Sequence, residues 1–201
     1  DAGDPGTNGG ESQRGVFKRY KRAKFRDILD GTSNTIAMGE MGVSNEARGI
    51  QGYVFHKPAG DDFDHPNKTR PIFCKSGIHI NPDQPSQYAA GSLWPRGRRW
   101  ADGHVHSTAV STVLSPNSPS CMRAADGYDG LYSFGSNHQG GAHALMSDGA
   151  VRFITDSIET GDLNSPSVSN TGGFTPAGSK SPYGLWGALG TIAGKESVSI
   201  E

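Results

Sequence analysis

The chain has 201 residues, of which 33% are hydrophobic, 29 are glycine and 12 are proline. This length suits one domain, residues 1–201, while the glycine and proline content predicts many turns and no long helices. The 19 basic and 20 acidic residues leave a formal net charge of −1. Charge therefore gives no global reason to bind nucleic acid or an anionic membrane.

Short β-strands are predicted in the first part of the chain at 15–17, 34–41 and 53–56, with a helical turn over 25–29. The segment 17–26 interleaves basic and aromatic residues, a pattern that can suit phosphate contacts and base stacking. A solvated strand edge or interface rim is the favoured interpretation. No run approaches the roughly 18 apolar residues of a membrane helix, and no signal peptide is recognisable. The start at Asp1 resembles the middle of a loop, so we expect a fragment or a processed product.

A polar block, Asp30-Gly31-Thr32-Ser33-Asn34, precedes the second predicted strand. Its Gly-Thr-Ser part is similar to the nucleophile motif of subtilisin-like proteases. A catalytic triad also needs a histidine oriented by a buried carboxylate, and the histidine motif of those enzymes is missing. The favoured interpretation is a turn held by its own side chains.

Segment 57–130 is rich in Pro, Asp, Asn and Gly without periodicity, which predicts a long loop-rich insertion within the domain. Asp61, Asp62, Asp64 and His65 lie close together near its start. Carboxylate oxygens are ligands that calcium prefers, but the EF-hand spacing is absent. A solvated loop is the favoured alternative, so calcium is only a possible cofactor and none is predicted.

His104 and His106, which follow Asp102, would project to the same face of a strand. With a third ligand such a pair can hold zinc or another transition metal. The sequence offers no evident third ligand, so these histidines are weak metal candidates and no metal site is predicted.

Exposed aromatic and arginine side chains of the insertion form a candidate ligand or subunit contact. The set comprises Trp94, Trp100, Tyr88 and Arg98, with Arg96 and Arg99 nearby. Aromatic and arginine residues together favour recognition surfaces.

Cys74 and Cys121 lie in polar, proline-rich surroundings, which indicates a staple across a long loop rather than a core position. A disulfide is expected in an exported protein and would stabilise this one by about 4 kcal/mol. Two unpaired thiols remain the alternative.

The segment 136–158 predicts a β-hairpin, with strands near 142–146 and 150–154 around Asp148-Gly149, a strong tight-turn signal. His138 precedes the first of these strands. A structural role for this histidine is favoured over an active-site role. Near the C-terminus, one amphipathic turn over 183–189 is expected to press Trp186 into the core.

The spacing from His138 through nine residues to Asp148-Gly149 resembles the H-X9-DG signature of prepilin-processing-associated proteins, which are abundant in planctomycete bacteria. Four further segments resemble blocks of that family, in the same order. They are 25–36 followed by Gly39-Glu40, 100–103, 116–121 and 181–191. The C-terminal domain of this family has no known function and carries a solute-binding-like label. The resemblance implies structural roles for His138, Asp148, Gly149, Glu40 and the 30–34 block.

The predicted strands and few helical turns indicate a β-rich α+β fold. The resemblance adds an antiparallel-sheet, pilin- or pseudopilin-like head, whose hydrophobic N-terminal helix is missing from this chain. It implies a non-enzymatic, exported filament or cell-surface subunit that assembles with itself and meets a membrane only through that helix. A secreted saccharide- or solute-binding module is the alternative. A hydrolase would need a histidine beside Ser33.

Overall fold

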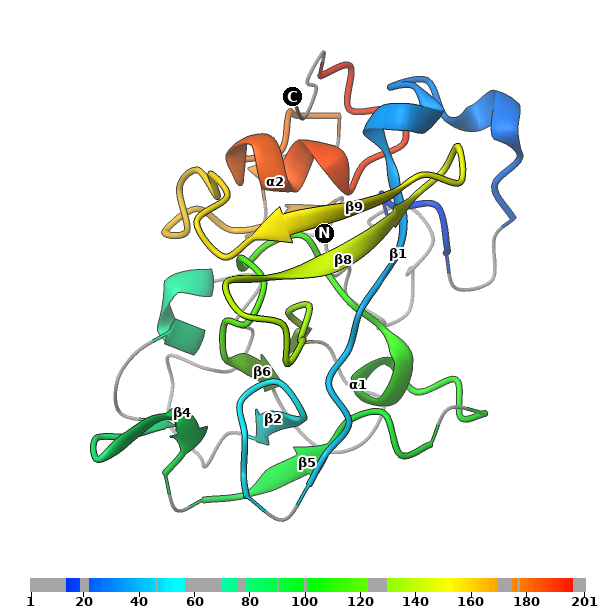
Figure 1. Ribbon diagram of the computed structural model, residues 1–201. Helices are drawn as coiled ribbons and strands as arrows, with labels where there is room; N and C mark the ends of the chain where they lie inside the picture. Colours follow the sequence, from blue (N-terminus) through cyan, green and yellow to red (C-terminus); the bar gives the residue numbers. More distant parts are fainter. Residues whose placement is uncertain are drawn as a thin grey trace.

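The computed structural model describes residues 14–18, 22–45, 47–56, 70–75, 79–89, 91–99, 101–122, 130–169, 175–176 and 178–196. Short strands in several small sheets dominate this part of the chain, and the helices are brief (Figure 1). The predicted β-rich α+β fold is confirmed. Within the described ranges, no helix has the length and apolar character needed to cross a bilayer.

The strands are β1 (Ile36–Gly39), β2 (Tyr53–His56), β3 (Ile80–Asn81), β4 (Gln84–Tyr88), β5 (Leu93–Pro95), β6 (Ser120–Met122), β7 (Gly130–Leu131), β8 (Gly141–Met146), β9 (Val151–Thr155), β10 (Val168–Ser169) and β11 (Thr175–Pro176). The α-helices are α1 (Val105–Thr108) and α2 (Gly184–Leu189), and the 3-10 helices are η1 (Phe25–Asp27), η2 (Thr32–Asn34) and η4 (Pro71–Lys75). Residues 15–17 form a bend, so the strand predicted there is wrong.

The predicted hairpin is confirmed as β8 and β9, which form an antiparallel sheet in the order β1-β8-β9, called here the hairpin sheet. The turn between the two strands uses both Asp148 and Gly149. Gly149 has a φ of 94°, which favours glycine, and the Asp148 carboxylate accepts a 2.9 Å hydrogen bond from the N–H of Ala150.

A β-bulge in β1 decides which side chains of this strand face outward. Ile36 pairs with Met146 and is buried, but the register shifts before Met38, which is exposed. Gly39 faces inward, where an added Cβ would lie 1.9 Å from the Phe134 ring. One extra residue thus turns Met38 toward solvent and Gly39 toward the core.

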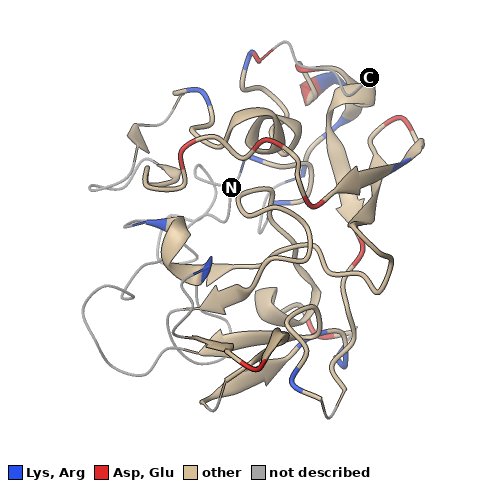
Figure 2. Cartoon of the chain, turned by 60° about the vertical axis from the view of Figure 1, so that its left-hand side comes forward, with Lys and Arg blue, Asp and Glu red and all other residues tan. Residues whose placement is uncertain are grey.

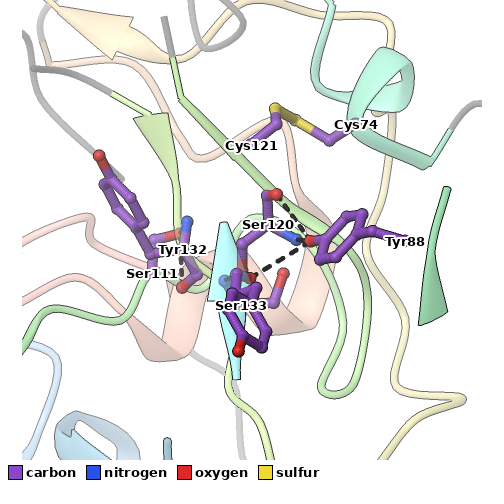
Figure 3. The surroundings of a disulfide bond; sticks show 8 residues. Cys74, Tyr88, Ser111, Ser120, Cys121, Tyr132 and Ser133 are labelled. Atoms are coloured by element: carbon purple, nitrogen blue, oxygen red, sulfur yellow. Dashed lines mark hydrogen bonds between the residues drawn. A yellow bond between two sulfur atoms is a disulfide. The ribbon is translucent and has the colours of Figure 1, made fainter. Parts of the chain in front are cut away.

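The second sheet, called here the mixed sheet, has the order β5-β2-β6-β7, and β2 pairs parallel with β6. Segment 57–130, predicted as a loop-rich insertion, supplies β5 and β6, so it contributes to a core as well as to loops. The expected disulfide joins Cys74 of η4 to Cys121 of β6 (Figure 3), with 5.5 Å between their Cα atoms. Both cysteines are only 1% exposed and lie in an apolar cluster. The expectation of a non-core staple is wrong, because apolar residues distant in sequence surround the bond.

Helix α2 covers the inner face of the hairpin sheet. Trp186 is fully buried in the cluster formed with this sheet and meets Phe134 edge-on, with 5.0 Å between ring centroids. Its indole N–H donates a 2.8 Å hydrogen bond to the carbonyl of Leu114. The prediction that this turn presses Trp186 into the core is confirmed.

Arg96, at the end of β5, has no solvent-exposed surface although it carries a charge. Its guanidinium donates hydrogen bonds to the carbonyls of Ser133 (2.6 Å) and Ala109 (2.8 Å) and to the Ser120 hydroxyl (3.2 Å). Desolvation lowers the pKa of Arg96 to about 10. This arginine, expected beside a ligand surface, instead joins the end of β5 to β6, to the residue after α1 and to the segment after β7.

Candidate functional site

The polar block 30–34 joins three parts of the chain. The carboxylate of Asp30 accepts hydrogen bonds from the Thr191 hydroxyl (2.9 Å) and from the backbone N–H groups of Gly194 (2.6 Å) and Lys195 (2.9 Å). Asp30 therefore anchors the segment that follows α2.

The same block receives the turn of the hairpin. The N–H of Asp148 donates to the carbonyl of Thr32 (3.1 Å), and the N–H of Ser147 donates to the carbonyl of Thr35 (2.8 Å). The hydroxyl of Thr35 closes the block on itself with a 3.0 Å hydrogen bond to the carbonyl of Gly31, which has a φ of 95°. These contacts are those of a structural turn.

Ser33 and Asn34 complete the block within η2. Ser33 is exposed, and the side-chain amide of Asn34 donates a 3.5 Å hydrogen bond to the carbonyl of Asp30. Asn34 therefore contributes to holding the turn, whereas Ser33 is exposed to solvent.

The candidate ligand-contact residues do not form one surface. Tyr88 is 1% exposed, and its hydroxyl donates to the carbonyl of Ser120 (2.8 Å) and accepts from the Ser120 N–H (2.7 Å) (Figure 3). Burial raises the pKa of this phenol well above its ordinary value. The prediction that Tyr88 contacts a ligand is wrong, because its side chain is buried in an apolar cluster with Ile50 and Phe55.

Trp94 and Arg98 remain near the surface. Trp94 is half-buried, with its ring edge-on to His106 at 5.4 Å between centroids. Arg98 is exposed and lines an open hollow of about 410 Å³ with Arg99, Ala101 and Asp102. Trp100 lies outside the described residues.

The strand geometry predicted for His104 and His106 is wrong. His104 is the N-cap residue of α1 and contacts the carboxylate of Asp102, whereas His106 is buried within the helix. Residues two apart in a helix do not share a face, and the two rings lie 6.2 Å apart between centroids. The calcium candidates Asp61, Asp62 and Asp64 lie outside the described residues.

A different group of potential metal ligands lies on the hairpin sheet, on the face opposite to the one that α2 covers. Glu40, His138 and His143 each offer one ligand atom, and these three atoms lie within 4.8 Å of one another. The Glu40 Oε1 atom is 3.3 Å from His143 Nδ1 and 3.7 Å from His138 Nε2. The exposed fractions of the side chains are 35% for Glu40, 59% for His138 and 38% for His143.

The bulge in β1 places Glu40 beside His143. The Glu40 N–H donates to the His143 carbonyl (3.0 Å), and the His143 N–H donates back to Glu40 Oε2 (2.8 Å). Partial burial alone would raise the pKa of Glu40. Hydrogen bonds from the His143 backbone, the Ser136 hydroxyl and the His143 ring, with the charge of that ring, nevertheless hold the pKa below its usual range. The carboxylate is therefore ionised.

The loop that carries His138 is held by Asn117, which itself has a φ of 56°. The Asn117 side chain accepts a hydrogen bond from the Ser136 N–H (2.9 Å) and donates one to the Gly141 carbonyl (3.2 Å). The Ser136 hydroxyl in turn accepts from the His138 N–H at 3.1 Å. Both ends of this short loop are fixed, so His138 is held near the other two side chains.

Apolar side chains surround this cluster. Across the hairpin sheet, Met38 pairs with Leu145 and Leu145 with Val151, while His143 pairs with Phe153. Met38, Val151 and Phe153 are 54%, 64% and 44% exposed. We call Met38, Leu145, Val151 and Phe153 the outer face; α2 covers the opposite face of the same sheet (Figure 1).

Charged residues do not concentrate in this way. Figure 2 shows the lysines, arginines and acidic residues of the described chain scattered over several elements and loops.

The sequence interpretation named Glu40 and His138 as structural and did not single out His143. His143 lies within a run identified from its apolar neighbours. Strand alternation could have shown that it faces away from the core, but the bulge that brings Glu40 beside it has no evident sequence signal.

The comparisons with known proteins reach the family level. Residues 2–161 match the model of a family described as a protein of unknown function, DUF1559 (SBP_bac_10). No curated protein matches the chain. No solved structure matches it either.

Proposed function

The chain belongs to the DUF1559 family of proteins of unknown function, so the family does not supply a role. From the surface of the chain itself, we propose that it is a non-enzymatic, pilin-like subunit of an exported filament or cell-surface polymer. The observation that carries this proposal is the exposed, apolar outer face of the hairpin sheet. Its occupant is a second copy of this chain.

The size and placement of the exposed side chains support this proposal. Met38, Val151 and Phe153 come from both edge strands and have large exposed fractions. A single exposed apolar residue is ordinary, whereas a contiguous apolar group marks an interaction site. The side chains lie in register across three strands, which suits packing against another regular surface.

The disulfide supports the exported part of the proposal. Disulfides persist in oxidising compartments and are rare in the cytosol. The Cys74–Cys121 bond is enclosed in an apolar cluster together with Val113 and Leu131, which suits a permanent structural bond. An extracellular or cell-surface location follows as part of this proposal.

The test combines self-association in vitro with contact mapping on cells. Sedimentation velocity over a concentration series should show reversible association that the double variant V151S/F153S loses. The matched control is V43S, because Val43 is equally exposed, at 64%, but lies outside the hairpin sheet. In the native gene product, a Val151→Cys variant should form cross-linked dimers at the cell surface. Monomers at all concentrations together with no Val151 cross-link would overturn the proposal.

A saccharide- or solute-binding module is the second candidate, supported by the open hollow at Arg98, Arg99 and Asp102. Guanidinium and carboxylate groups at one hollow can recognise hydroxyl-rich solutes. Saccharide-array binding that R98A abolishes, with V151S/F153S still binding, would favour this function over assembly.

A further inference from the structure

We propose that Glu40, His138 and His143 form a binding site for a divalent transition-metal ion of the zinc class. The donor set carries this assignment: two imidazole nitrogens and one carboxylate oxygen, which such ions bind in three-ligand sites with an open position. The assignment does not rest on the proposed assembly role, because one chain carries all three ligands, although these lie on the same face of the sheet.

The spacing of the donors fits a single ion. Metal–ligand bonds of about 2.0–2.1 Å at a tetrahedral angle place neighbouring ligand atoms about 3.3–3.4 Å apart. The His143 Nδ1 to Glu40 Oε1 distance is already 3.3 Å, and the His138 Nε2 to Glu40 Oε1 distance is 3.7 Å. All three ligand atoms lie within 4.8 Å of one another. A small movement of His138, the most exposed of the three, would therefore bring them to the spacing of ligands around one ion.

The surrounding structure holds the three ligands in advance of binding. Glu40 is fixed to β8 through its backbone and through Oε2, which leaves Oε1 directed at the histidines. Asn117 and Ser136 hold the loop of His138. Preorganisation of this kind reduces the entropic cost of assembling a metal site.

The backbone of His138 is held by its loop, but without a metal few contacts fix its imidazole. Its side chain is 59% exposed, and its contact with Glu40 at 3.7 Å is a surface ion pair at most, a class that contributes little to stability. The His138 and His143 rings are nearly perpendicular, at 83°, with centroids 4.9 Å apart. Two imidazole nitrogens and one carboxylate oxygen meet at this solvent-facing site, a donor set that ions of the zinc class bind.

The ion would keep at least one position open to solvent. The three side chains are all partly exposed, and Phe153 lies edge-on to His143 at 5.2 Å between centroids. Water is the simplest occupant of that position. An adjacent aromatic ring would shield one side of the site from bulk solvent.

The test is titration of the metal-free protein with Zn²⁺ against a chromophoric chelator, with Co²⁺ absorption as a second readout. We expect one ion per chain and a tetrahedral or five-coordinate Co²⁺ spectrum. H138A should weaken Zn²⁺ binding by at least about 100-fold, since even changes to residues behind the ligands cost about 10–100-fold. H138A is the primary variant because the described hydrogen bonds of this loop run through the His138 backbone.

Two control variants remove the other candidate ligands. H104A removes the exposed histidine beside Asp102, and D61N/D62N/D64N/H65A removes the acidic and histidine side chains of residues 61–65. Both variants should retain binding. Glu40→Gln should reduce affinity as H138A does, with an unchanged near-ultraviolet circular dichroism spectrum. Wild-type affinity no higher than that of H138A, or binding lost in either control variant, would overturn the assignment.

Discussion

Reduction of the Cys74–Cys121 disulfide should destabilise the domain by about 4 kcal/mol. The two cysteines are 47 residues apart in sequence. In the chain-entropy model, closing a loop of that length removes about 14 cal/mol/K from the unfolded ensemble, which is about 4 kcal/mol at 25 °C. Because each cysteine is only 1% exposed, the reduced thiols stay buried, and the loss reports the cross-link rather than a change in solvation.

Urea unfolding of oxidised and reduced protein measures this loss directly. With a denaturant slope of about 2 kcal/mol/M, the midpoint should fall by about 2 M. The variant C74A/C121A then separates packing from cross-linking, because its further loss relative to reduced wild type comes from the missing sulfur atoms. A loss below about 1 kcal/mol on reduction would refute the reasoning and show that the reduced, unfolded chain keeps structure around these residues.

Three further changes test the fold. Burial raises the pKa of Tyr183 above its unfolded value, so its contribution to stability is complete below about pH 10 and falls above it. The unfolding free energy of Y183F should therefore decline less steeply there, by about 1.4 kcal/mol per pH unit; equal slopes in urea titrations would contradict this. Gly149→Ala should lower the unfolding free energy by about 1–2 kcal/mol, because φ is 94° while the space around the new Cβ is open. Gly103→Ala, where the space is also open but φ is not positive, should be nearly neutral. Equal melting temperatures for the two variants would contradict this argument. Arg96→Met should cost at least about 2 kcal/mol in urea unfolding, because hydrogen bonds to charged donors contribute about 1.5–3 kcal/mol each; an unchanged midpoint would show that apolar packing replaces them.

The features that the sequence predicted correctly have local signals. The hairpin follows from Asp148-Gly149 between two apolar runs, and the inward Trp186 follows from one amphipathic turn. The disulfide has only one possible pairing within a chain of two cysteines. In each case a few neighbouring residues, or a count, contained the required information.

The features that were missed depend on residues far apart in sequence. Tyr88 and Arg96 resemble surface recognition residues, yet both are buried because Ser120 and Ser133 bring hydrogen-bonding groups from segments distant in sequence. His104 and His106 were assigned strand spacing, but a helical turn begins at that point. A buried polar network is specified by all of its partners together, so no single segment reveals it.

The two ends of β8 separate the structural part of this region from the proposed metal site. At the turn, the Asp148 carboxylate accepts a hydrogen bond from the Ala150 N–H and closes the hairpin, whereas at the other end Glu40 and His138 converge on His143 in contact with solvent. Asp148→Ala should therefore lower the unfolding free energy and leave Zn²⁺ affinity unchanged in the fraction that folds. His138→Ala should lower Zn²⁺ affinity and leave the unfolding free energy of the metal-free protein unchanged. If either variant changed stability and affinity together, the two ends would form one cooperative unit, and the histidine would be better explained as part of the fold.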